Sequence, residues 1–230
     1  MIKKTDIYVA IDTESLSDAK NIINQLNYKY CGIKIGKELF TACGPEIVIW
    51  AKKKGFKVFL DLKFHDIPNT VMKACVAASK LNVDILNVHA LGGKDMMMAA
   101  KDAIKDKQIK LIGVTLLTSH DKSYLEEIGL VGSIDDCIKR LAISAAESGL
   151  DGIVCAAADI PNIRKYLPNA FIYITPGIRL EKIINDDQKR AANPIDAVSF
   201  GSDILVIGRP ITGAPNPQEK LIKVYNQINS

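Results

Sequence analysis

Long hydrophobic runs are absent from this sequence. No apolar run approaches the roughly 18 residues that a membrane-spanning helix needs, although 48% of the 230 residues are hydrophobic. The opening residues, Met1–Asp6, contain lysines and an aspartate, and they lack the apolar stretch of roughly 7–15 residues found in secretory signals. We therefore predict a soluble, cytoplasmic protein with no membrane partner.

Cysteine and histidine are also scarce. The five cysteines are far apart and form no C-x-x-C pair, which argues against a disulfide framework or a zinc site and favours reduced thiols. The three histidines have no cysteines or paired carboxylates at ligand spacing. No G-x-G-x-x-G motif follows the first predicted strand, which argues against dinucleotide binding. We predict that the protein uses no metal and no cofactor.

The chain also has no strong net charge of either sign. The chain has 30 Lys+Arg against 26 Asp+Glu, a formal net charge of +4. The lysines are dispersed, and the densest run, Lys52–Lys54, is typical of a solvated helix face. This pattern does not indicate a nucleic-acid partner. The charged fraction of 24% and the hydrophobic content are instead typical of a folded globular chain.

Short apolar runs rich in β-branched residues recur along the whole chain. They show no clear alternation of polar and apolar positions, which is typical of strands covered on both faces. The predicted strands are Ile7–Ile11, Gly32–Ile35, Lys57–Leu62, Ile85–Val88, Lys110–Leu116, Gly152–Cys155, Phe171–Ile174 and Ile204–Ile207.

Segments with helical spacing separate these runs. They are the stripe Leu16–Leu26, a segment that begins near Pro45, and Val71–Leu81, Met96–Ile104, Ile134–Ser148, Ile160–Tyr166 and Gln218–Ile228. Strand–helix alternation repeated eight times predicts an α/β protein, a single (β/α)₈ barrel domain of the TIM type that spans residues 1–230. An open doubly wound sheet is the alternative.

Polar residues follow most of the predicted strands. They are Asp12, Lys34, Asp61–Asp66, His89, Thr118–Ser119, Pro176–Arg179 and Gly208–Arg209. In a barrel of this type, chemistry gathers at the C-terminal ends of the strands. Asp61 and Lys63 are two residues apart and therefore point to the same side of a strand, and we expect Asp12 and Lys34 to approach them from neighbouring strands.

Two interpretations of this Asp/Lys group are open. It is either an ion-pair network that ties strand ends together, or an array in which a lysine held charged by carboxylates donates a proton. The loops after the seventh and eighth strands frequently bind phosphate in such barrels. Here they carry Arg179, Gln188, Gly208 and Arg209, where glycine exposes backbone N–H groups and arginine offers a planar fork to an anion. Alternatively, Arg209 is a surface arginine.

The run Asp61–Thr70, with the sequence DLKFHDIPNT, closely resembles the signature of the orotidine 5′-phosphate decarboxylase family. The resemblance extends over nearly the whole chain, with no departure at a motif position. Further matches follow in the family's order: Val9–Asp12, Lys34–Gly36, Asn87–Ala90, Leu116–Ser119, Pro176–Arg179, Asp187–Gln188 and Gly208–Ile211.

This resemblance implies a metal-free decarboxylation of orotidine 5′-phosphate to uridine 5′-phosphate (UMP), the last step of de novo pyrimidine synthesis. It also implies a homodimer of barrels with active sites at the interface. The catalytic array would comprise Lys34, Asp61, Lys63 and Asp66, with Asp66 supplied by the partner chain. Lys63 is the expected proton donor to C6 of the pyrimidine.

The resemblance also implies the residues that bind substrate. Asp12 and Lys34 would contact the ribose, with Ile67 and Thr70 contributed by the partner chain. Thr118 would lie on the pyrimidine side. The phosphate region would be bound by Arg179, Gln188, Gly208 and Arg209. We further expect the polar segment from Arg179 to Asn193 to close over the phosphate.

Two other functions fit parts of the sequence. The Asp-x-Lys-x-x-Asp strand also resembles Mg²⁺-dependent barrel decarboxylases or aldolases of sugar phosphates, but Lys34 stands where that group typically has an acidic metal ligand, and an ammonium is a poor partner for a cation. A catalytically silent nucleotide-binding barrel is the other alternative, and the complete Asp/Lys array argues against it.

Overall fold

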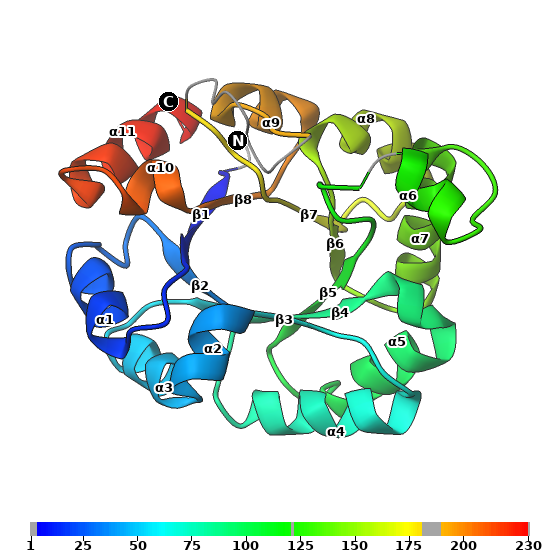
Figure 1. Ribbon diagram of the computed structural model, residues 1–230, viewed down its shortest axis with the longest axis horizontal. Helices are drawn as coiled ribbons and strands as arrows, with labels where there is room; N and C mark the ends of the chain where they lie inside the picture. The colour runs from blue at the N-terminus through cyan, green and yellow to red at the C-terminus, as the bar shows by residue number, and fades with distance from the viewer. Residues whose placement is uncertain (1–3, 121, 181–189, 230) are drawn as a thin grey trace.

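Eight parallel strands close into a barrel in chain order, so that β1 pairs with both β2 and β8 (Figure 1). The computed structural model describes residues 4–120, 122–180 and 190–229. The predicted closed barrel is therefore confirmed, and the open doubly wound sheet is wrong. The strands are β1 (Asp6–Ile11), β2 (Gly32–Gly36), β3 (Val58–Phe64), β4 (Ile85–His89), β5 (Lys110–Val114), β6 (Gly152–Val154), β7 (Ile172–Thr175) and β8 (Ile204–Ile207).

Most strand boundaries lie within one or two residues of the predicted ones, and β5 shows the difference that matters for function. It ends at Val114, whereas the apolar run predicted a strand as far as Leu116. Leu116 and Leu117 therefore belong to the segment that follows the strand. An apolar run alone does not show where the backbone leaves the sheet, because buried loop residues are apolar too.

Helices surround the barrel and cover its outer face (Figure 1). They are α1 (Leu16–Asn24), α2 (Lys37–Cys43), α3 (Glu46–Lys53), α4 (Pro68–Ser79), α5 (Gly93–Ala103), α6 (Lys122–Glu127), α7 (Ile134–Glu147), α8 (Ile160–Ile163), α9 (Pro194–Phe200), α10 (Arg209–Thr212) and α11 (Pro217–Asn229). The sequence did not predict α2, α6, α9 or α10, each of seven residues or fewer, because two turns or less show no clear helical period. Among the described residues, no helix is long and apolar enough to span a membrane.

The apolar core has two layers. The larger one lies between the strands and the surrounding helices. The smaller one fills the barrel interior and consists of Tyr8, Ala10, Phe59, Ile85, Ile112, Ile174, Ile204 and Val206. Within it, the rings of Tyr8 and Phe59 pack edge to face with centroids 6.3 Å apart. Ala10, Phe59, Ile174 and Val206 also line the cavity at the barrel mouth, so the inner core forms the apolar wall of the site.

Candidate active site

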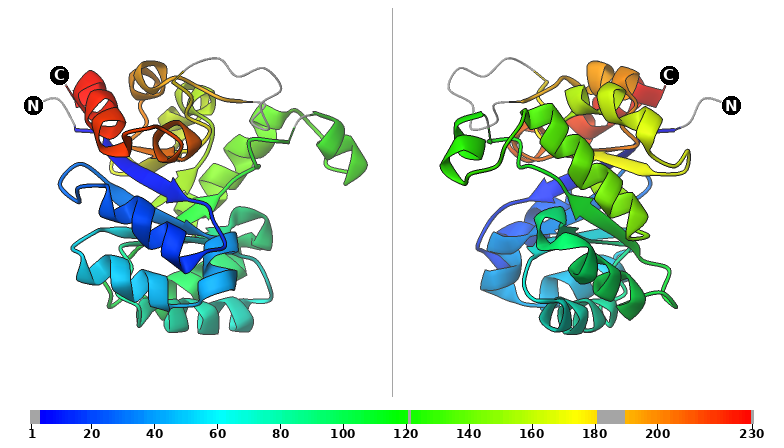
Figure 2. Two further views of the ribbon diagram at one scale, coloured as in Figure 1. Left: turned by 60° about the vertical axis from the view of Figure 1, so that its left-hand side comes forward. Right: turned by 90° about the vertical axis from the view of Figure 1, so that its right-hand side faces the viewer.

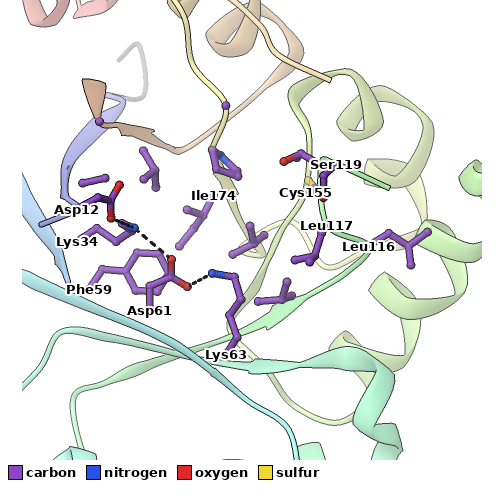
Figure 3. A pocket seen from close by; sticks show the side chains of 18 of the residues that line it. Asp12, Lys34, Phe59, Asp61, Lys63, Leu116, Leu117, Ser119, Cys155 and Ile174 are labelled. Carbon is purple, nitrogen blue, oxygen red and sulfur yellow. Dashed lines mark hydrogen bonds and ion pairs between the residues drawn. The ribbon is translucent and has the colours of Figure 1, made fainter. Parts of the chain in front are cut away.

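A cavity of about 390 Å³ opens at the C-terminal ends of the strands. Charged side chains line one side of it and the segment after β5 lines another (Figure 3). The charged and polar lining includes Asp12, Lys34, Asp61, Lys63, Thr118, Ser119, Arg179 and Arg209. The rest of the lining is formed by Ala10, Phe59, Val114, Leu116, Leu117, Val154, Cys155, Ile174, Pro176, Gly177, Val206 and Gly208. This combination of an apolar wall and a few convergent polar groups is typical of a small-molecule site.

The carboxylates and ammonium groups alternate across the cavity. Lys34 Nζ lies 3.1 Å from Asp12 Oδ1 and 3.6 Å from Asp61 Oδ2. Lys63 Nζ lies 2.6 Å from Asp61 Oδ1. The chain of contacts therefore runs Asp12–Lys34–Asp61–Lys63 and joins the ends of β1, β2 and β3 (Figure 3). The structure brings these four residues together, as their positions at the strand ends predict.

The contact between Asp61 and Lys63 depends on an irregular strand. The pairing of β3 with β4 shifts register between Leu60 and Phe64, and Lys63 has a positive φ of 51°, which is uncommon for a residue with a side chain. The prediction assumed the regular alternation of an ideal strand, and that assumption is wrong. Strained backbone of this kind concentrates at functional sites.

Asn87 on β4 supports this irregular strand, and its role was missed from the sequence. Its side-chain oxygen accepts a hydrogen bond from the Lys63 backbone N–H at 2.8 Å. Its amide nitrogen donates to Asp61 Oδ1 at 2.7 Å. Asn87 is completely buried, and the available signal was an asparagine within an apolar strand, since a buried amide needs partners.

The surroundings of Asp61 favour its charged form. Burial, the largest single influence, raises the pKa of this carboxyl, but Lys63, Lys34 and the hydrogen bonds from Lys63 and Asn87 together hold the pKa below its ordinary value. Asp61 therefore remains ionised at neutral pH between two lysines. A carboxylate in this position orients the ammonium group of Lys63 through their 2.6 Å contact.

Arginine and glycine residues at the ends of β7 and β8 also line the cavity. Arg179 and Gly177 follow β7, and Gly208 and Arg209 follow β8. Gly177 has a φ of 71°, a conformation that glycine adopts without steric cost. The fourth residue predicted for the phosphate region, Gln188, lies outside the described residues, as does most of the segment expected to close over the phosphate.

Three predicted site residues lie away from this cavity. Asp66, Ile67 and Thr70 follow β3, are exposed, and do not line the cavity of their own chain. Asp66 Oδ1 accepts a hydrogen bond from the Ile67 N–H at 2.6 Å. The Ile67 side chain is 66% exposed, although isoleucine is among the residue types most often buried.

The segment after β5 contributes two apolar cavity residues that the sequence did not reveal. Leu116 and Leu117 lie beside Thr118 and Ser119, the polar residues that the sequence placed after the fifth strand, of which Thr118 was predicted to bind substrate. Cys155 follows the neighbouring strand β6, also lines the cavity and is fully buried; burial raises the pKa of its thiol well above the ordinary value, so it stays neutral. Such residues escape detection because apolar cavity walls and packed cores have the same composition.

The donor set of the cavity is a poor match for a divalent cation. Among the described residues, no three His, Cys, Asp or Glu side chains cluster in a way that could hold a metal ion. Asp12 and Asp61, the carboxylates of the cavity, both form ion pairs with Lys34. An ammonium group therefore lies between the two hard oxygen donors that a Mg²⁺ ion would need.

Comparisons with known proteins agree with one another. The family model described as orotidine 5′-phosphate decarboxylase / HUMPS family matches residues 5–224. The orotidine 5′-phosphate decarboxylase of Nitrosococcus oceani is 44% identical over 231 residues, with 100% of both chains covered, and that of Nitrosomonas eutropha is 47% identical, with 97% of both covered. The crystal structure of orotidine 5′-phosphate decarboxylase from Lactobacillus acidophilus is 32% identical, with a TM-score of 0.89, and the alignment covers 99% of this chain and 100% of that chain.

Proposed function

Because this chain belongs to the orotidine 5′-phosphate decarboxylase / HUMPS family, we propose that it decarboxylates orotidine 5′-phosphate to UMP and CO₂, as the last step of pyrimidine synthesis. The observation that carries this proposal is the alternating contact chain Asp12–Lys34–Asp61–Lys63 at the barrel mouth. Fold membership alone would not distinguish a decarboxylase from other barrels, whereas this array has the charges that the reaction needs.

The reaction leaves an electron pair on a carbon that has no adjacent carbonyl to accept it. The bond between C6 and the carboxylate carbon breaks, CO₂ departs, and the electron pair stays on C6. Fixed charges provide the stabilisation, and Lys63 is the cation that supports this role. Its ammonium group then donates a proton to C6 and is reprotonated from water.

Asp61 holds Lys63 in place for this step. The 2.6 Å contact between the two side chains restricts the motion of the lysine and points its ammonium group into the cavity. Lys34 lies on the other side of Asp61 and contacts Asp12, which supports binding of the ribose hydroxyl groups by Asp12 and Lys34. The apolar wall formed by Phe59, Ile174 and neighbouring residues limits the water around the reacting carbon.

A decarboxylation assay with and without a chelator tests the proposed function. We expect the absorbance of orotidine 5′-phosphate to fall at the same rate with and without EDTA, because the ammonium group of Lys34 lies between the two carboxylates that a metal ion would need. Activity that disappears with EDTA would indicate the Mg²⁺-dependent chemistry of related barrels. Binding of UMP without release of CO₂ would indicate a silent nucleotide-binding barrel.

The arginine after β8 supports phosphate binding by this cavity. We expect Arg209→Ala to lower kcat/KM for orotidine 5′-phosphate about 100-fold, because charge-assisted hydrogen bonds to a phosphate contribute a few kcal/mol. Turnover of orotidine, which has no phosphate, should not change. Arg164→Ala is the matched control, since Arg164 donates to the Gly201 carbonyl at 3.0 Å outside the cavity. Equal losses on both substrates would contradict the phosphate role.

We further propose a homodimer in which each chain completes the site of the other. Asp66, Ile67 and Thr70 form an exposed group on the α4 side of β3. Met98 on α5 and Val76 on α4 are also exposed, at 50% and 39%, and α4 and α5 pack side by side. These exposed apolar side chains on neighbouring elements support an interface on this face, because apolar side chains that gather on one exposed surface mark interaction sites.

Mixing two inactive variants tests this arrangement. In a symmetric dimer, Lys63→Ala and Asp66→Asn damage the same site when they are in different chains, and the second site of the mixed dimer is intact. We therefore expect an equilibrated equal mixture to recover about one quarter of wild-type activity, since half of the dimers are mixed and each has one working site. A mixture as inactive as its components would show that Asp66 acts within its own chain.

A further inference from the structure

A buried ion pair lies beside the cavity without lining it. Arg190 Nη1 donates to both carboxylate oxygens of Asp159, at 2.8 and 2.9 Å. The side chains are only 20% and 8% exposed. Neither residue contributes to the cavity wall, so the chemistry proposed above makes no direct use of this pair.

The Arg190–Asp159 pair joins segments that follow two neighbouring strands. Asp159 lies just after β6, where its carboxylate also accepts a hydrogen bond from the Ala156 N–H at 3.0 Å. The second amino group of Arg190 donates to the backbone carbonyls of Leu116 and Leu117, at 3.5 and 3.3 Å. One guanidinium therefore connects the segment after β6 with residues 116–119, which we call the 116–119 segment.

The 116–119 segment has left the sheet and needs other support. β5 ends at Val114, and all four residues of the segment line the cavity. The Leu117 carbonyl accepts a hydrogen bond from the His120 N–H at 2.9 Å as well as from Arg190. Arg190 thus holds the backbone of the turn that presents Thr118 and Ser119 to the cavity.

Only an arginine can make all of these contacts. Its planar fork reaches the carboxylate and the carbonyls at once, whereas a lysine offers a single charged nitrogen. Burying a charged pair costs desolvation free energy, and an ordinary hydrophobic pair of similar size is often as stable. Packing alone would therefore not require a charged pair here. The contacts of Arg190 are made with the side of the cavity formed by the 116–119 segment.

We propose that Arg190 and Asp159 are positioning residues that hold the 116–119 segment in the shape that recognises the pyrimidine ring. The inference rests on the proposed function, because it assumes a ligand with a pyrimidine base. It assigns no contact with substrate to either residue. Its consequence is that damage to the pair should weaken recognition of the base while recognition of the phosphate remains.

The conservative variant Arg190→Lys tests this directly. It keeps a cation beside Asp159 but loses the bonds to the two carbonyls. We expect the dissociation constant for UMP to rise about tenfold, as for the loss of one to two hydrogen bonds, while that for ribose 5-phosphate changes less than about twofold. Isothermal titration calorimetry with both ligands measures the difference.

Lys101→Arg is the matched control. Lys101 forms an ion pair with Asp151 at 2.6 Å, at the other end of β5 and β6, with side chains 28% and 20% exposed. This exchange should change neither dissociation constant. The double variant Asp159→Asn, Arg190→Gln removes both charges and leaves no unpaired ion in the interior. It should show the same selective loss of UMP binding, and it keeps the test available if Arg190→Lys does not fold.

Two results would overturn the inference in different ways. Equal losses for UMP and ribose 5-phosphate, or no loss for either, in variants of a wild-type enzyme that decarboxylates orotidine 5′-phosphate would overturn the positioning role and leave the proposed function intact. A wild-type protein that neither binds UMP nor releases CO₂ would overturn both.

Discussion

Replacing Lys63 by alanine should lower kcat for orotidine 5′-phosphate by about ten-thousandfold and leave part of the affinity for UMP. In the proposed mechanism, the substitution removes both the cation that stabilises charge at C6 and the proton that ends the reaction. We expect binding of UMP to depend mainly on other residues that line the cavity, among them Arg179, Arg209 and Asp12. Steady-state kinetics and calorimetry with UMP separate the two effects.

The barrel offers a closely matched control for Lys63. Lys52 also forms a 2.6 Å contact with an aspartate, Asp84, and the two lysine side chains are 27% and 26% exposed. Lys52→Ala should therefore carry a similar cost in stability with no effect on turnover, since Lys52 lies outside the cavity. Near-normal turnover by Lys63→Ala would remove Lys63 from the role of proton donor.

Replacing Asp61 by asparagine should lower kcat about a thousandfold, because the neutral amide no longer holds the ammonium group of Lys63. Asp61 contacts both lysines of the cavity and accepts a hydrogen bond from Asn87. Since its charge is compensated by Lys63 and Lys34, we expect the affinity for orotidine 5′-phosphate to change less than about threefold. Single-turnover kinetics and equilibrium binding of the substrate measure these two quantities.

Another outcome would assign a different role to Asp61. Tighter binding of orotidine 5′-phosphate together with slower turnover would mean that the carboxylate repels the substrate carboxylate in the wild-type complex. Asp84→Asn is the control, because Asp84 also pairs with a lysine and accepts a backbone hydrogen bond, from Val58 at 2.6 Å. Its effect should be confined to stability.

The fold was largely predictable from the sequence. Eight β-branched runs separated by helical stripes are sufficient for a barrel, because a parallel strand covered on both faces must be nearly all apolar. The short helices α2, α6, α9 and α10 were not predictable, since a helix of about one or two turns leaves no period to detect. In Figure 2, α6 extends beyond the strand ends near the barrel mouth, away from the main layer of helices. A helix in this position does not need the long apolar face by which helices are recognised in a sequence.

The candidate site was likewise predictable in part. The order of the strands and the presence of Asp12, Lys34, Asp61 and Lys63 at their ends can be read from the chain, because every strand of such a barrel delivers its last residues to one mouth. The sequence also carries the family signature Asp61–Thr70. These features together determine the barrel, the charged array and the chemistry that we propose.

Tertiary structure alone decided how that array is held. The register shift in β3, the positive φ of Lys63 and the two hydrogen bonds of Asn87 arise from contacts between β3 and β4. The bonds from Arg190 to Asp159 and Leu117 join residues 31 and 73 positions apart in the chain. Local propensity and periodicity carry no record of such partners, because a long-range hydrogen bond is specified by where the folded backbone places two groups.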